Sequence, residues 1–261
     1  MKNLNIFLKT FFFLAALSAT AVVFNSCEKD DNDGGNGGTS VKLLESISYD
    51  GELSHKFEYD NENRITKVLV YYDFTDIPGI YTFIYDDNSV SMSFEYPPIF
   101  ANDDFWETYT KNGNIITVTK SFFSANTIAT IELDAEEKPV KYIVDSDSYM
   151  QTYTYEYTNG NLVKQDFEEV RKDMSIPAFP AFTTFTYDNK KSPFYYCKTP
   201  SWCLDSFLSW AFRSEISIKN NVKSITWNDN IRRIFTLSYD GDFLKSWNDG
   251  IYTRIFTYIT K

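Results

Sequence analysis

Few residues in this chain have the types and spacing that catalysis requires. Among its 261 residues there is one histidine, His55, which lies between Leu53 and Phe57 in a strand-like run. A histidine that acts as a general base needs a nucleophile and an orienting carboxylate, and the residues around His55 mark neither. No nucleophile elbow, phosphate-binding loop or His-Glu-x-x-His motif occurs. The sequence therefore predicts no catalytic residue and no cofactor.

Paired carboxylates are another route to catalysis, because glycoside hydrolysis uses two acids about 5–10 Å apart across a groove. Acidic neighbours occur at Asp103 and Asp104, at Asp145 and Asp147, and at Glu168 and Glu169. Acidic side chains are mostly exposed, so most of these are expected to be solvated turn residues. A hydrolase is therefore the least favoured function.

Two cysteines of the body, Cys197 and Cys203, lie on either side of Pro200. In an exported protein a disulfide between them is reasonable, and so short a loop would contribute about 2 kcal/mol. Two buried free thiols are the alternative, because Cys203 falls in the first turn of a predicted helix. A zinc site would need more cysteine or histidine ligands than the chain offers, so no metal site is predicted.

Aromatic residues make up 18% of the chain, with 19 Tyr, 23 Phe and 5 Trp. Rings stack on sugar faces and in peptide grooves, and tyrosine adds a polar group. The same rings are also common in the packing of a sheet, which is the alternative for each of them. The candidate residues for a ligand-binding platform are Tyr153, Tyr155, Tyr157, Trp106, Trp227 and Trp247.

The first 26 residues have the three parts of a secretory signal peptide. Lys2 and Lys9 precede an apolar stretch at 11–24, and the small residue Ser26 stands directly before Cys27. This order predicts a lipoprotein signal, with Cys27 as the lipidated N-terminus of the mature protein. An uncleaved membrane anchor and an ordinary cleavage site are the alternatives. Several acyl chains on one cysteine would make the attachment effectively permanent.

Residues 28–40 contain no apolar side chain and include four acidic residues followed by a glycine-rich run. Such a segment cannot bury enough surface to offset the entropy of ordering, so it is predicted to be a flexible tether. The run from Glu28 to Asp31 resembles the Lys-plus-acidic export signal of Bacteroidetes surface lipoproteins. That resemblance implies an outward-facing protein on the outer membrane. A tether facing the periplasm is the alternative.

The charge of the chain limits its partners. Lysine and arginine number 25 against 36 acidic residues, for a net charge of −11. Residues 1–26 hold two lysines and no acid, so removing them leaves 23 against 36, or −13. A surface of this sign repels nucleic acid and anionic lipid, and both are excluded as expected partners.

From residue 41 onward, strand-like runs alternate with turn signals every 8–12 residues. We predict an all-β domain at 41–261, built as one curved antiparallel meander of about 14–16 strands that forms a barrel or half-barrel with a filled inner face. The candidate strands are 43–49, 53–59, 65–72, 80–85, 89–96, 105–111, 114–122, 127–133, 140–144, 149–157, 162–170, 182–187, 222–227, 231–239, 243–247 and 251–259.

One segment, near residues 200–213, has helical rather than strand periodicity. Thr199 suits the N-cap and Pro200 the first helical position. An apolar stripe follows at Leu204, Phe207, Leu208 and Ala211. We expect this short helix to cover an open face or end of the sheet. A partner-binding helix is the alternative.

Hairpins in this body share a unit in which a strand ends in Tyr-Asp or Tyr-Thr, a turn follows, and an apolar residue opens the return strand. The unit occurs at Tyr59, Tyr157 and Tyr239, with weaker copies at Tyr85 and Tyr187. It resembles the Tyr-Asp hairpin repeats of Rhs-type proteins. Repeats of this kind imply a sheet that grows by adding hairpins, each leaning on its neighbours.

A longer resemblance covers roughly residues 43–261. The segment at 187–194, the predicted helix and the run at 219–222 resemble a family of gut-Bacteroidetes lipoproteins that is described as a domain of unknown function with a porin-like fold. The resemblance implies a curved, barrel-like antiparallel sheet in an anchored protein. It implies no activity, because none is assigned to that family.

Taken together, these features favour a non-enzymatic cell-envelope lipoprotein that binds an extracellular ligand, such as a glycan, through aromatic rings. The second hypothesis is a structural or accessory subunit of an outer-membrane assembly, whose exposed rings would form a protein interface. A contiguous aromatic groove would favour the first hypothesis and a broad apolar patch the second.

Overall fold

The computed structural model describes residues 40–72, 75–97, 105–122, 125–172, 181–204, 218–228 and 230–261. The predicted signal peptide, Cys27 and nearly all of the predicted tether lie outside these residues. Seventeen strands form one sheet. They are β1 (Lys42–Tyr49), β2 (Glu52–Tyr59), β3 (Ile65–Tyr72), β4 (Thr75–Asp86), β5 (Ser89–Glu95), β6 (Phe105–Asn112), β7 (Ile115–Phe122), β8 (Ala125–Leu133), β9 (Pro139–Asp145), β10 (Tyr149–Thr158), β11 (Asn161–Arg171), β12 (Ala181–Lys191), β13 (Asn220–Trp227), β14 (Ile231–Ile234), β15 (Thr236–Asp240), β16 (Phe243–Asn248) and β17 (Thr253–Thr260).

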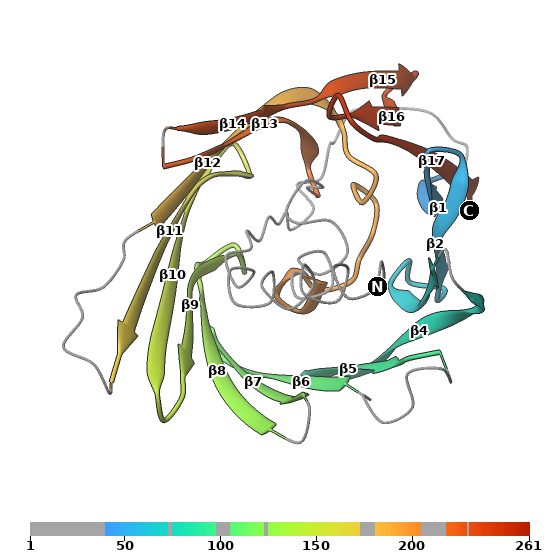
Figure 1. Cartoon of the computed structure of the whole chain (residues 1–261). Coiled ribbons are helices and arrows are strands. Elements are labelled where there is room, and N and C mark those ends of the chain that lie inside the picture. The colour runs from blue at the N-terminus through green and yellow to red at the C-terminus, as the bar shows by residue number, and fades with distance from the viewer. Residues whose placement is uncertain are drawn as a thin grey trace, which may run out of the picture.

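The sheet closes on itself as an antiparallel barrel (Figure 1). From β1 to β14 each strand pairs with the next, β15 to β17 pair in the same way, and β1 pairs with β17 from Lys42↔Thr260 to Tyr49↔Arg254. β14 and β15 are two halves of one strand, joined at Phe235, whose N–H donates to the carbonyl of Lys223 at 2.9 Å. The predicted all-β meander is thus confirmed, in its barrel form. Every strand finds its partners between Lys42 and Thr260, so the closed sheet lies wholly within residues 41–261.

The meander sorts its turns onto two rims. The proximal rim, named for residue 41 where the chain enters the barrel, holds the turns after β2, β4, β6, β8, β10 and β15 and the connection from β12 to β13. Val41 and Lys261 exchange backbone hydrogen bonds of 2.9 and 3.0 Å there. The distal rim holds the remaining turns, including that of Asp50 and Gly51 between β1 and β2. Their φ angles of 48° and 94° are the positive values that a tight hairpin requires.

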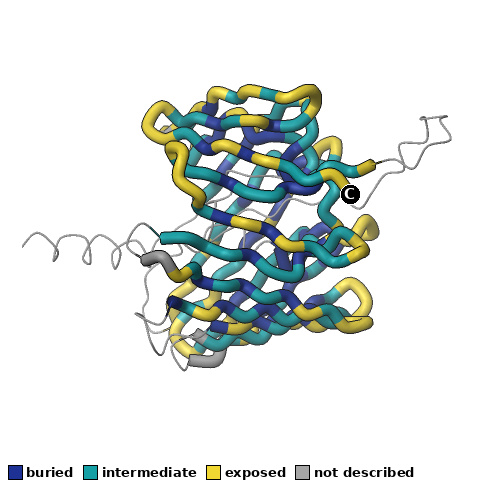
Figure 2. Tube along the Cα trace, turned by 90° about the vertical axis from the view of Figure 1, so that its right-hand side faces the viewer, coloured by how far each residue is buried: buried dark blue, intermediate teal, exposed yellow. Residues whose placement is uncertain are grey.

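Alternation along the strands fills the interior. Along β5, buried Val90, Met92 and Phe94 alternate with partly exposed serines at 89, 91 and 93. Figure 2 shows the same alternation of buried and less buried positions along many strands, with exposed positions gathered at the turns. Side chains of successive residues point to opposite faces of a sheet, so the buried set points inward. These buried side chains belong to one hydrophobic cluster inside the barrel.

The connection after β12 runs into the barrel instead of over its surface (Figure 1). Phe194 is fully buried, and its ring lies 5.5 Å from that of Phe57 on β2. Trp202 is 6% exposed and lies 6.2 Å from the ring of Tyr109 on β6. We call residues 192–204 the inner segment, and its aromatic side chains complete the core.

The first turn of the predicted helix is present at 201–204, at the end of the inner segment. Leu204 is fully buried, so this turn lies within the core. Because the sheet closes, it has no open face for this turn to cover, and the expectation that the helix covers an end of the sheet stays a prediction. The rest of the predicted helix, from 205 to 213, lies outside the described residues.

One charged pair inside the barrel joins two neighbouring strands. Glu107 on β6 is 1% exposed, and one of its carboxylate oxygens lies 2.7 Å from Nζ of Lys120, its neighbour on β7. The Tyr109 hydroxyl donates to the same carboxylate. A buried ion pair of this kind costs several kcal/mol to break from one side, so Glu107 and Lys120 fix the register of β6 on β7.

His55 on β2 also points inward and is 8% exposed. Burial, together with the nearby Arg254 guanidinium, lowers the pKa of His55 from 6.5 to about 3. Its Nδ1 lies 2.7 Å from the hydroxyl of Ser54. The ring is therefore neutral at pH 7 and belongs to the core.

Because the unfolded chain protonates His55 below its ordinary pKa of 6.5 whereas the folded protein does so only near 3, this residue makes stability fall as the pH falls. The free energy of unfolding should drop by about 1.4 kcal/mol per pH unit from this group below pH 6.5. Urea unfolding at pH 7 and pH 5 measures the effect. In a His55→Gln variant the loss between these two pH values should shrink by about 2 kcal/mol, and an unchanged loss would contradict the assignment.

Candidate functional site at the proximal rim

The turn between β2 and β3 is organised by the carboxylate of Asp60. It accepts hydrogen bonds from the backbone N–H groups of Glu62 and Arg64, both at 2.9 Å, and from Nε of Arg64 at 2.7 Å. Asn63 adopts a positive φ of 65°, which asparagine tolerates well. Partial burial alone would raise the pKa of Asp60, but the hydrogen bonds from Arg64 and Glu62 outweigh it and hold the pKa below its usual range. The turn is thus fixed at neutral pH.

The same turn recurs between β8 and β9. The carboxylate of Asp134 accepts from the backbone N–H groups of Glu136 and Lys138 at 2.8 and 2.9 Å, and Glu137 has a positive φ of 62°. Lys138 pairs with Glu136 as Arg64 pairs with Glu62. Two hairpins on the proximal rim therefore use one rule, an acid at the first position, a glutamate at the third and a cation at the fifth.

Tyrosines on this rim bind carbonyls of the strand beside them. In each case the tyrosine lies near the end of one strand, and the carbonyl belongs to an apolar residue near the start of the previous strand. The hydroxyls of Tyr59, Tyr85 and Tyr258 donate to the carbonyls of Leu44, Ile65 and Leu244 at 2.8, 2.6 and 2.6 Å. Each carbonyl lies beside a position where the strand register shifts, so the tyrosines support irregular points of the ladder.

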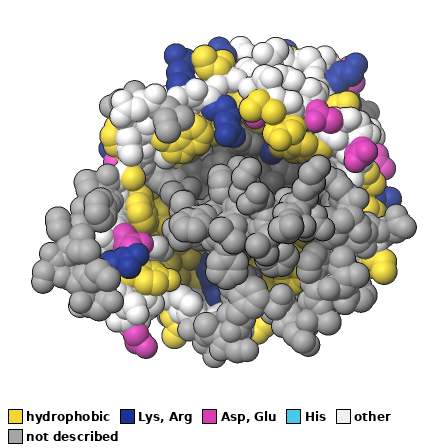
Figure 3. Space-filling model, in the orientation of Figure 1, with side chains coloured by type: hydrophobic (Ala, Val, Ile, Leu, Met, Phe, Trp, Pro, Cys, Tyr) yellow, Lys and Arg dark blue, Asp and Glu magenta, His cyan; other side chains and the backbone are white. Residues whose placement is uncertain are grey.

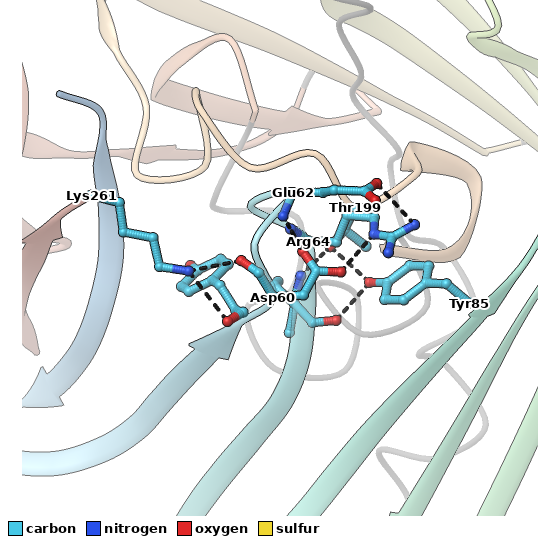
Figure 4. A network of polar contacts seen from close by, with 8 residues as sticks. Asp60, Glu62, Arg64, Tyr85, Thr199 and Lys261 are labelled. Carbon is cyan, nitrogen blue, oxygen red and sulfur yellow. Dashed lines mark hydrogen bonds and ion pairs between the residues drawn. The ribbon is translucent and has the colours of Figure 1, made fainter. Parts of the chain in front are cut away.

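Thr199 of the inner segment joins this arrangement from inside the barrel (Figure 4). Its Oγ1 accepts from the backbone N–H of Ile65 at 2.7 Å and lies 3.0 Å from the Tyr85 hydroxyl. A tyrosine hydroxyl has one hydrogen, and that of Tyr85 goes to the Ile65 carbonyl, so Thr199 donates to the Tyr85 oxygen. Both backbone groups of Ile65 are thereby satisfied, one by Thr199 and the other by Tyr85.

Two cations complete the network. The Arg64 guanidinium lies over the ring of Tyr85, 4.4 Å from its centroid. Nζ of the C-terminal residue Lys261 donates to the carbonyls of Asp60 and Tyr59 at 2.8 and 3.3 Å. Figure 4 shows these residues converging from β2, β3, β4, the inner segment and the C-terminus. Burial raises the pKa of Tyr85 well above its ordinary value, so its hydroxyl stays protonated.

An open depression of about 720 Å³ lies beside this network. Its lining is polar. It comes from the residue before β3, from the end of β4 with the turn into β5, and from β6. The lining residues are Arg64, Tyr85, Asp86, Asp87, Asn88, Ser89 and Thr110. Two carboxylates, an amide, two hydroxyls, a guanidinium and a ring edge offer hydrogen-bond donors and acceptors in one place. This depression is the candidate functional site.

The aromatic platform expected from the sequence does not form. Tyr153, Tyr155 and Trp247 are 1%, 6% and 2% exposed and point into the barrel. The prediction of a surface platform is wrong for these three residues, because the tyrosine face of β10 and the tryptophan of β16 are the inward faces of a closed sheet.

The other three platform candidates are separate from one another. Trp106 on β6 is 40% exposed near the distal rim. Trp227, at the end of β13, is partly buried with Arg233 over its ring at 5.7 Å. Tyr157, near the end of β10, packs against the core with Lys138 at 5.9 Å from its ring. The structure does not bring these rings together.

Cys197 and Cys203 are free thiols and do not form the disulfide that was the other possibility. Sγ of Cys203 donates to the carbonyl of Pro200 at 3.0 Å. Burial raises the pKa of both thiols, which makes them poor nucleophiles. Lipidation of Cys27 lies outside the described residues.

Sequence reasoning missed Arg64, Asp86, Asp87, Asn88 and Thr110 as site residues. A signal for the turn was present, since 60–64 and 134–138 both have an acid, a glutamate and a cation at alternate positions. Nothing in the sequence indicated that Thr110 on β6 lies beside the turn after β4. Thr110 lies beside that turn because β5 pairs with β4 on one side and with β6 on the other.

The described residues contain no helix long and apolar enough to cross a membrane. Within the same ranges, no three histidine, cysteine, aspartate or glutamate side chains are grouped closely enough to hold a metal ion.

A Thr199→Val substitution tests the network, because valine has the same shape but no hydroxyl. The backbone N–H of Ile65 would lose its acceptor in a buried position, since Thr199 is 5% exposed. We expect a loss of about 2 kcal/mol in the free energy of unfolding by urea. Tyr85→Phe, which leaves the bond between Thr199 and Ile65 intact, should cost about 1 kcal/mol. Equal or reversed losses would contradict the assignment of the Thr199 hydroxyl as the acceptor of the Ile65 N–H.

The comparisons with known proteins give an architectural likeness. No protein-family model matches the chain, and no curated protein matches it. Among solved structures, a porin-like protein from Bacteroides uniformis ATCC 8492 is similar over 85% of this chain and 97% of that chain, with 13% sequence identity and a TM-score of 0.49. The predicted resemblances to Rhs-type repeats and to a gut-Bacteroidetes lipoprotein family stay predictions.

Proposed function

We propose that the protein is a non-enzymatic cell-envelope lipoprotein that binds a hydroxyl-rich ligand, such as a glycan, in the depression on its proximal rim. The observation that carries the proposal is the lining of this depression, where seven polar or aromatic residues from three strands and their turns meet beside a cross-linked network. A site held by neighbouring hydrogen bonds loses little entropy on binding.

The chemistry of the lining fits a ligand with many hydroxyl groups. The carboxylates of Asp86 and Asp87 accept hydrogen bonds, and Asn88 both donates and accepts. Arg64 uses Nε on Asp60 and one further nitrogen on Glu62, which leaves other guanidinium N–H groups for a ligand. The ring of Tyr85 also lines the depression, with the Arg64 guanidinium over it.

The acidic pairs do not favour hydrolysis. Asp86 and Asp87 are adjacent in one hairpin turn, whereas glycosidases place their two acids on opposite sides of the bond. Asp145 pairs with Lys172, and Glu169 accepts from Gln151 at 2.8 Å and from Arg171 at 3.1 Å. Asp103 and Asp104 lie outside the described residues.

The envelope location rests on the sequence. The signal-like residues 1–26, Cys27 and the acidic segment at 28–40 support a lipid-anchored protein on the outer membrane, facing outward by its resemblance to exported surface lipoproteins. A periplasm-facing anchor is the alternative orientation. The first strand of the barrel begins at Lys42, which leaves residues 28–40 for the proposed tether.

An accessory subunit of an outer-membrane assembly would need a broad apolar patch on one side. Large apolar side chains are exposed on the described part of the barrel, but they occur on many different strands. We therefore keep ligand binding as the proposal.

A glycan array probed with residues 41–261 tests the proposal. Binding should be detected, and an Asp86→Ala/Asp87→Ala variant should bind at least about tenfold more weakly, because two charge-assisted hydrogen bonds are lost.

The matched control is Glu136→Ala/Glu137→Ala, which removes the same charge from another turn of the same rim and should bind within about twofold of the parent. Absence of glycan binding, or equal losses in both variants, would refute the proposal.

A further inference from the structure

Large apolar side chains are exposed mainly near one end of the barrel. Ten of the eleven that are exposed in the described residues lie on the distal rim or within four residues of it along their strands. We call these ten residues the distal belt. They are Leu53, Ile77, Trp106, Ile128, Met150, Val170, Ile234, Ile251, Tyr252 and Ile255.

The distal belt goes around the barrel. Its members come from β2, β4, β6, β8, β10, β11, β14, β17 and the turn between β16 and β17. Figure 3, which looks along the barrel, shows hydrophobic side chains at several positions around the ring and not on one side of it. The eleventh residue, Ile84 on β4, lies at the opposite end and is 59% exposed.

Strand pairing joins part of the belt into a continuous row. Ile128 faces Asp145, Asp145 faces Met150, and Met150 faces Val170 across four neighbouring strands. Asp145 is the charged member of this row, and it is paired with Lys172. The row thus presents apolar side chains with its one carboxylate neutralised by a cation.

We propose that the distal belt rests in the surface of a neutral lipid bilayer, so that the barrel stands end-on with its proximal rim facing away from the membrane. A folded protein partner meets one side of a barrel, whereas a bilayer surface meets the whole circumference of its end. Trp106 and Tyr252 belong to the belt, and such rings favour the level of the lipid headgroups. The net charge of −11 favours neutral over anionic lipid.

The length of the N-terminal segment permits this orientation. Residues 28–40 can span at most about 45 Å, and the eight residues of β2 rise about 27 Å. A lipid on Cys27 and a belt at the distal rim can therefore contact the same membrane. Two contacts hold a protein on a bilayer more firmly than one. The candidate ligand site would then face outward, but this inference does not depend on ligand binding there.

The test uses residues 41–261, which contain the whole closed sheet, and flotation with phosphatidylcholine vesicles. The parent should float with the vesicles, and adding phosphatidylglycerol should not strengthen binding. Ile128→Asp and Ile234→Asp, at side chains that are 60% and 61% exposed on well-separated strands, should each weaken binding by about tenfold.

Ile84→Asp is the matched control, since Ile84 is equally exposed at the other end. It should bind vesicles within about twofold of the parent, and circular dichroism should show all variants folded.

Failure of the parent to bind vesicles, an equal loss in Ile84→Asp, or a loss in only one of the two belt variants would overturn the proposal. Vesicle binding that persists in the Asp86→Ala/Asp87→Ala variant separates this result from the outcome of the glycan test. If the parent ignores vesicles but captures a protein that Ile128→Asp releases, the belt is a protein interface and the proposal is wrong.

Discussion

Pairing between the first and last strands is the constraint on which the rest of the structure depends. Once β1 and β17 are joined from Lys42 to Tyr49, every strand has one face that points into the barrel and must be buried. Alternation supplies apolar side chains to that face, but a barrel of this many strands encloses more space than those side chains alone fill. The inner segment supplies Phe194, Trp202 and Leu204 to the same core. Closure therefore explains why the connection after β12 runs inward.

Closure also explains where polar groups can act. Inside, Glu107 is paired with Lys120, His55 is neutral, and the Arg254 guanidinium lies over the rings of Tyr49 and Trp247. At the proximal rim, register shifts leave backbone groups that tyrosine hydroxyls and Thr199 satisfy. The resulting network fixes the turn after β2 beside the turn after β4. The depression beside these turns is therefore lined by residues that the network holds in place. Binding chemistry therefore gathers at the rim and not in the interior.

Much of the fold could be predicted from the sequence, because strands with period-two patterns and Asp-Gly or Tyr-Asp turns are local features. The sixteen candidate strands all have counterparts, and the one divided strand breaks at Phe235, where its partner changes from β13 to β16. The candidate site could not be predicted in the same way. Tyr153, Tyr155 and Trp247 look like exposed rings until closure decides which face is inside. The sequence around Thr199 predicts a helix cap. Its bond to the backbone N–H of Ile65, 134 residues earlier in the chain, depends on the tertiary fold.

The inner segment is part of the core that the closed barrel surrounds. Hydrogen–deuterium exchange of residues 192–204 measures this, because amides of the segment donate to the carbonyl of Asn63 in the turn after β2 and to that of Pro200 in the segment itself. We predict that these amides exchange as slowly as those of the neighbouring strands, since both require opening of the same core. Exchange within seconds, as in an exposed loop, would contradict the claim.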